Sequence, residues 1–478
     1  MERRSVSMEK LQKNTKKMNN PVENSYIGSK DFAISKLSVV TKLYVWSVII
    51  EPLLFFMVLD AETLGVTANV SKLLQFTIFI YLIIKVLTNR SFSFIVPSLF
   101  SRLNIDFLYY FIWTVIVGFY GLFIGAYNIE NDVATGSGVW ATVHYRPIFE
   151  YIVLLYYFIY FMLLPRYFLS NAIAINYFFK VFTIVFYVFL FVGFGDLILN
   201  YIFPGDTYPG IPRHLSDSVN VGLRFHSFAG EPRDAFVYLM FGLCIIALKG
   251  IWENTKKPSK ILFLLVIIAA LLTQSFSGLL GVLFFCGLYI MFGNFKWLDI
   301  KNYLYLIIIL FFITASVFLF DRLLLYFNAI IKFLFFTKDI ENINSILSVS
   351  LNNVNPIWQR IQEVMDFNLF PTMFGTGLGS SSITNINLFN VHKIANPNAN
   401  IIRTIFESGI IGLFIFILVF LKPLKQIDAS KRELLILKTA MLLMLGLFFG
   451  HRSPELFIFF GIVLAVYKVK SQSRKIYI

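Results

Sequence analysis

The chain has 478 residues, of which 58% are hydrophobic and only 14% are charged. Because a soluble domain is nearer to half apolar and a quarter charged, this composition excludes an ordinary soluble protein and indicates an integral membrane protein. The formal net charge of +14 does not by itself imply a nucleic-acid partner, since membrane proteins collect lysine and arginine in cytoplasmic loops that face anionic lipid.

Residues 1–38 are polar and lysine-rich, which predicts a disordered basic cytoplasmic tail. After this tail the sequence contains about 12 apolar runs near the ~20 residues that a membrane-spanning helix needs. The expected spans are residues 39–59, 72–88, 106–126, 148–164, 176–202, 234–250, 261–275, 277–293, 302–320, 401–421, 433–449 and 455–468. The sequence therefore predicts an all-α polytopic membrane protein with about 12 transmembrane helices.

Lysine and arginine in the short connections predict the orientation of the spans. If the basic N-terminus is cytoplasmic, the basic connections and the basic tail 469–478 all lie on the same side. The other side then holds an outer loop, residues 203–233, within the first group of spans at 39–320. It also holds a large outer loop, residues 321–400, which is expected to carry short helices and precedes the last spans at 401–468.

Arginine and histidine collect on the outer side, against the usual bias of positive charge toward the cytoplasm. The arginines concerned are Arg146, Arg224, Arg233, Arg360 and Arg452, with Arg403 just inside a span. Arginine suits phosphate because its planar fork makes paired, charge-assisted hydrogen bonds and stays ionised. The pattern predicts a site for a lipid-linked diphosphate at the outer face, and single arginines that reach phospholipid head groups are the alternative.

The segment RFHSFAGEPR, residues 224–233, concentrates these groups at the outer mouth of one span. Arg224 and Arg233 are expected to hold phosphate oxygens or sugar hydroxyls there. Glu231 or His226 is a candidate catalytic base, since a base must reach within hydrogen-bond distance of the attacking hydroxyl. The alternatives are a Glu231–Arg233 pair near the positive end of a helix dipole and an ordinary surface histidine.

The glycine-rich stretch FGTGLG, residues 374–379, would let backbone N–H groups approach a phosphate, and a turn without a ligand is the alternative. Glu407 is expected to be a polar contact at a helix start or between helices rather than a base. Cys244 and Cys286 both lie in apolar runs, and the outer loops hold no aspartate pair at metal-binding spacing. Neither a metal nor a cofactor is expected.

Four segments, taken in their order along the chain, carry a resemblance to a known family. They are RFHSFAGEP (224–232), TQSFSGLLG (273–281), FGTGLG with Arg360 upstream, and ANPNANIIRTIFESGIIGL (395–413). In these segments the chain resembles the O-antigen polymerase and O-antigen ligase superfamily, over roughly residues 100–470. The members are multi-span bacterial proteins that handle undecaprenyl-diphosphate-linked glycans at the outer, periplasmic face of the inner membrane.

The resemblance implies a metal-independent glycosyltransferase that polymerises carrier-linked repeat units into O-antigen or capsule-type polysaccharide. Its partners would be these glycans, the lipid bilayer and a chain-length regulator protein, without nucleic acid. Ligases of the superfamily usually carry a His–Asn pair where this chain has Asn398 and Ala399. This departure favours a polymerase, with Asn398 among the substrate-binding candidates. A ligase that transfers polymer to lipid A core and a flippase for the same lipid-linked sugar remain alternatives.

Overall fold

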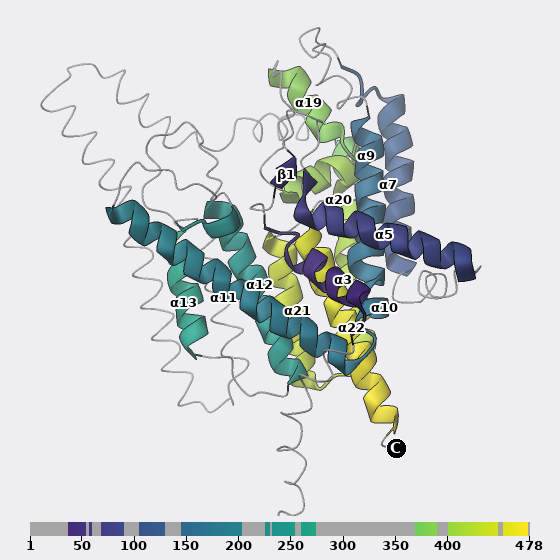
Figure 1. Ribbon diagram of the computed structural model, residues 1–478. Coiled ribbons are helices and arrows are strands. Elements are labelled where there is room, and N and C mark those ends of the chain that lie inside the picture. The colour runs from purple at the N-terminus through teal and green to yellow at the C-terminus, as the bar shows by residue number, and fades with distance from the viewer. Residues whose placement is uncertain are drawn as a thin grey trace, which may run out of the picture.

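The computed structural model describes residues 37–53, 57–59, 68–89, 105–129, 145–202, 225–229, 232–253, 260–273, 369–389, 400–447 and 453–476. These residues form a bundle of apolar helices, drawn as coloured ribbons in Figure 1. The helices are accompanied by a short two-stranded β-sheet. In this sheet β1 (Met57–Leu59) pairs antiparallel with β2 (Ala68–Asn69).

The helices follow one another along the chain with few long gaps in the first half. In order they are α3 (Val39–Ile49), α5 (Val70–Asn89), α7 (Ile105–Phe123), α9 (Arg146–Tyr157), the π-helical turn η3 (Phe158–Leu163), α10 (Pro165–Phe168), α11 (Ala172–Ile202), η4 (Ser227–Ala229), α12 (Pro232–Trp252), α13 (Lys260–Leu272), α18 (Leu369–Phe374), α19 (Ser380–Phe389), α20 (Asn400–Leu421), η5 (Pro423–Gln426), α21 (Lys431–Leu447) and α22 (Pro454–Ile476).

Within the described part of the chain, six helical stretches are long and apolar enough to cross a membrane. They are Val70–Thr88, Ile105–Phe123, Arg146–Phe168, Ala172–Leu199, Asp234–Trp252 and Arg403–Gln426, and each coincides with an expected span. The chain is therefore a helical membrane protein, as the composition indicated. The expected spans 277–293 and 302–320 lie outside the described residues, as do most of the outer loop 321–400 and almost all of the expected tail 1–38.

The first expected span is shorter in the structure than the sequence suggested. α3 ends at Ile49, Glu51 lies in the turn that follows, and the chain continues into β1 instead of remaining helical to residue 59. Pro52 accounts for this end, because proline lacks a backbone N–H and disfavours the helical conformation in the residue before it.

The antiparallel packing of α7 and α20 defines two ends of the bundle. Lys422, just after α20, donates to Asp106 Oδ1 at the start of α7 at 2.6 Å. Lys468 of α22 donates to the Arg166 carbonyl at 3.3 Å, and this end is called the basic end. At the opposite end of α20 lies the loop of residues 375–379, and that end is called the glycine-loop end (Figure 1).

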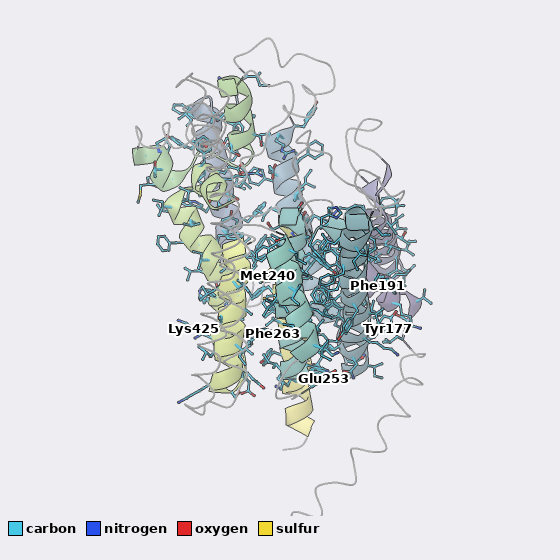
Figure 2. All side chains as sticks on the ribbon, turned by 90° about the vertical axis from the view of Figure 1, so that its left-hand side faces the viewer. Tyr177, Phe191, Met240, Glu253, Phe263 and Lys425 are labelled. Atoms are coloured by element: carbon cyan, nitrogen blue, oxygen red, sulfur yellow. The ribbon has the colours of Figure 1, made fainter. Side chains whose placement is uncertain are left out.

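The helices differ in how deeply they are enclosed. In α12, 72% of the candidate span is buried, whereas in α5 only 22% is buried. Met240 of α12, labelled in Figure 2, is 1% exposed among packed side chains. Phe123 and Phe191, by contrast, are 90% and 80% exposed. Exposed apolar side chains of this kind on long helices fit contact with lipid rather than with water.

Candidate functional site

α20 is broken at Gly409, and the break frees backbone carbonyl groups. Gly409 has φ +72° and ψ 173°, so the helical hydrogen-bond ladder is interrupted around it. Carbonyl groups released in this way need other donors when they are buried. The Ser408 carbonyl accepts from the indole Nε1 of Trp113 on α7 at 2.8 Å, which ties the two antiparallel helices together at the break.

The loop of residues 375–379, called the glycine loop, serves the two carbonyl groups before Ser408. Thr376 N donates to the Phe406 carbonyl at 2.9 Å, and Gly377 N donates to the Glu407 carbonyl at 2.8 Å. Both N–H groups are therefore directed at α20 and not at a ligand. Of the two alternatives for FGTGLG, the turn without a ligand fits these contacts, since Gly375 N also donates to a protein carbonyl, that of Pro371, at 2.7 Å.

Glycine is required in this loop by its backbone and by its neighbours. Gly375, Gly377 and Gly379 have φ of 89°, 101° and 83°, in the region that side chains rarely adopt. A Cβ on Gly375 would lie 2.5 Å from Gly409 N, and one on Gly377 would lie 2.0 Å from the Tyr127 hydroxyl oxygen. The loop can therefore lie directly against the broken part of α20 only because residue 375 carries no side chain.

Four charged side chains meet beside the glycine loop, and they are called the Arg–Glu cluster: Arg146, Glu150, Arg403 and Glu407. Glu150 Oε1 lies 2.8 Å from Arg146 Nε and 3.4 Å from Arg403 Nη2. Arg403 Nε lies 3.0 Å from Glu407 Oε1, which also accepts from Ser381 Oγ at 2.5 Å. The cluster therefore joins α9 to α20 and extends through Ser381 to α19.

The Arg–Glu cluster is buried and electrically balanced. The side chains of Glu150 and Glu407 are 3% and 0% exposed, that of Arg403 is 7% exposed, and that of Arg146 is 20% exposed. Each pair within a helix has i,i+4 spacing, which places both side chains on the same face. Buried charges are tolerated when they are paired, as these are, and Arg403 also donates hydrogen bonds to both Glu150 and Glu407.

The structure brings two of the expected diphosphate-binding residues together, with a partner that the sequence analysis missed. Arg146 and Arg403 both contact Glu150, although the sequence gives no role to Glu150. The i,i+4 spacing between Arg146 and Glu150 could have predicted the contact between these two residues, but it gives no sign of the contact between Glu150 and Arg403. Glu407 is a polar contact between helices, which confirms the expectation for that residue.

His226 lies in a different part of the bundle and is not a surface histidine. Its Nε2 is 3.3 Å from Asp196 Oδ2 of α11, and the side chains of the two residues are 11% and 1% exposed. The next residue, Ser227, has φ 50° and donates from Oγ to the Phe189 carbonyl at 2.6 Å, also on α11. In the described part of the chain, no contact links His226 to the Arg–Glu cluster.

A second buried polar network surrounds Glu51, which the sequence placed in the middle of a span. Gln75 Nε2 donates to Glu51 Oε2 at 2.6 Å, and Ser71 and Lys72 of α5 contact the same carboxylate. Tyr156 of α9 donates to the Gln75 amide oxygen. The network satisfies a carboxylate that is 7% exposed and joins three helices, which gives Glu51 a structural explanation.

The remaining expected site residues fall outside what the structure describes. They are Arg224, Glu231, Arg360, Asn398 and Arg452, together with the side chain of Arg233, whose backbone begins α12. Their expected roles stay predictions.

The site must therefore be interpreted from its own geometry. Its described groups are two linked arginines at the glycine-loop end and His226, which pairs with Asp196 of α11. Comparisons with protein-family models, with curated proteins and with solved structures found no match for this chain.

Proposed function

We propose that this chain is a glycosyltransferase that polymerises undecaprenyl-diphosphate-linked repeat units at the outer face of a bacterial inner membrane. The observation that carries the proposal is the Arg–Glu cluster, in which two arginines from distant parts of the chain meet at one end of a helical membrane protein. A carrier-linked diphosphate is an anion that arginine can hold through paired, charge-assisted hydrogen bonds.

The two arginines are suited to different tasks in this reaction. Two nitrogens of Arg403 face carboxylates, and its side chain is 7% exposed, so its role is to position the cluster. The side chain of Arg146 is 20% exposed and stands in the first turn of α9, so its guanidinium is the better phosphate contact. Because the cluster is electrically balanced, the surplus positive charge for a diphosphate would come from Arg224, Arg233, Arg360 and Arg452.

His226 is the candidate base whose surroundings the structure describes. The Asp196 carboxylate beside the imidazole orients the ring, and an oriented imidazole suits a group that accepts a proton. In the proposed reaction a hydroxyl of the acceptor glycan attacks the anomeric carbon of the donor glycan. The base takes the hydroxyl proton, and the carrier diphosphate leaves. Glu231 is the second candidate base, and Asn398 is a candidate sugar contact.

Deletion of the gene followed by electrophoresis of surface glycans tests the proposal. A polymerase predicts loss of the chain-length ladder, with a single repeat unit still attached to lipid A core. Polymer that accumulates on its carrier lipid would identify a ligase, and repeat units trapped on the cytoplasmic leaflet would identify a flippase. Either of these two results, or an unchanged ladder, contradicts the proposal.

A further inference from the structure

A cavity of about 600 Å³ opens at the basic end, far along α20 from the Arg–Glu cluster. It lies between α10, η5 with the residues after it, and α22. The lining residues are Leu163, Arg166, Tyr167, Ser170, Gln426, Ile427, Asp428, Leu464, Tyr467, Lys468 and Ser471. A volume of this size is in the range of small-ligand sites.

The charges around this cavity favour an anion. Arg166 and Lys468 line it, with Asp428 as the carboxylate among the lining residues. Lys468 Nζ donates to the backbone carbonyl of Arg166 at 3.3 Å, so its ammonium lies beside the residue that carries the guanidinium. A third cation, Lys85 of α5, donates to the Tyr167 hydroxyl and lies 5.0 Å from the centroid of its ring.

The other lining groups resemble what surrounds a lipid head group. The Ser170 hydroxyl offers a neutral donor to phosphate and glycerol oxygens, and the Ser471 hydroxyl, which donates to the Lys468 carbonyl at 2.9 Å, offers an acceptor to glycerol hydroxyls. Leu163 and Leu464 supply apolar surface next to these polar groups. Arg166 is only 8% exposed, so its guanidinium is already largely removed from water, where its attraction for an anion is stronger.

The position of the cavity in the molecule points to the source of the anion. The short connections at the basic end are the ones that the sequence assigns to the cytoplasmic side. Lipids of that leaflet carry a negative surface charge, and basic pockets between transmembrane helices can bind their head groups.

We propose that this cavity, called the Arg166–Lys468 cavity, binds the phosphate ester of an anionic glycerophospholipid. The site is separate from the Arg–Glu cluster and is independent of the glycosyltransferase proposal. Inorganic phosphate shares the phosphate chemistry of such a lipid, so the experiment has to distinguish the two sources.

The test uses the purified full chain in neutral detergent, titrated with phosphatidylglycerol and, in parallel, with phosphatidylcholine. Lipid retention is measured by native mass spectrometry, and stability by the melting temperature. We expect phosphatidylglycerol to be retained and to raise the melting temperature more than phosphatidylcholine does. Equal behaviour of the two lipids, or an equal rise with inorganic phosphate alone, would overturn the lipid proposal.

Matched variants locate the binding. Lys468 is exposed, so Lys468→Gln should fold normally and weaken retention of phosphatidylglycerol about fivefold, as expected for one basic group near the lipid surface. Lys425→Gln removes an exposed lysine at the same end that does not line the cavity, and it should leave retention unchanged. Arg166→Lys keeps the charge at the buried position, so its retention of phosphatidylglycerol should lie between that of the wild type and that of Lys468→Gln. Equal losses in Lys425→Gln and Lys468→Gln would show binding by general surface charge and overturn the assignment.

Discussion

Glu150 is the residue on which the Arg–Glu cluster depends, because one of its oxygens faces two guanidinium groups. Arg403 lies 253 positions away in the sequence, and Arg146 lies one helical turn away. Both arginines were site candidates because the sequence places them on the outer side of the membrane. No local sequence pattern could reveal that Arg403 contacts a carboxylate 253 positions away. Long-range pairing depends on how α9 and α20 pack, and this is why Glu150 was missed.

Replacing Glu150 with glutamine is expected to destabilise the protein by about 3–5 kcal/mol, since it leaves a buried arginine charge uncompensated. The double variant Glu150→Gln/Arg403→Gln restores the balance between the remaining Arg146 and Glu407. The double variant should therefore lose less stability than the sum of the two single variants. Melting temperatures of the four purified proteins measure this coupling, and additive losses would show that the contacts are not energetically linked.

Arg146→Ala tests the proposed phosphate contact at the same scale. Glu150 keeps Arg403 as a partner in this variant, so the fold should persist. Long glycan chains should fall by about 100-fold, the usual effect of removing one group that stabilises developing charge, while single lipid-linked repeats are still made. Glycan electrophoresis after complementation of a deletion strain is the measurement, with Lys425→Ala as the control. A normal ladder in Arg146→Ala would remove this residue from the mechanism.

At the scale of elements, the break in α20 and the glycine loop form one unit. The sequence showed the three loop glycines and Gly409, and it left open whether the loop held phosphate or only turned. The answer came from the carbonyl groups that the break exposes, and these depend on backbone angles that residue types alone do not specify. The apolar runs predicted the positions of most helices. They did not predict that α3 ends at Ile49, because the expected span was extended to the length that crosses a membrane and passed over Pro52.

Gly409→Ala is expected to be strongly destabilising, by more than the ~1–2 kcal/mol that an L-residue loses in the left-handed region. The added Cβ would also lie 2.3 Å from the Met373 carbonyl oxygen. Gly195→Ala is the matched control, because a Cβ at this helical glycine of α11 meets nothing within 4 Å. The control should be neutral or stabilised by up to about 1 kcal/mol. Similar melting temperatures for the two variants would contradict the role given to the break.

At the scale of the whole molecule, composition predicted a helical membrane protein, and the six candidate spans agree with it. α20 contains 22 residues and is broken at Gly409, so two helical halves rather than one straight helix extend from one end of the bundle to the other. The Arg–Glu cluster lies toward one end of this helix, and Lys422 follows its other end. The total number of spans remains a prediction, because α3, α13, α21 and α22 are not among these six and residues 274–368 lie outside the described chain.

The two ends of the bundle should face opposite sides of the membrane, and their orientation can be measured. Tyr145 precedes α9 at the glycine-loop end and is 57% exposed, while Lys425 is exposed at the basic end. In a variant without Cys244 and Cys286, Tyr145→Cys should react with a membrane-impermeant maleimide added to spheroplasts. Lys425→Cys should react only after the membrane is opened, because lysine-rich connections are retained in the cytoplasm. The reverse pattern would place the Arg–Glu cluster on the cytoplasmic side, where a periplasmic polymerisation site could not operate.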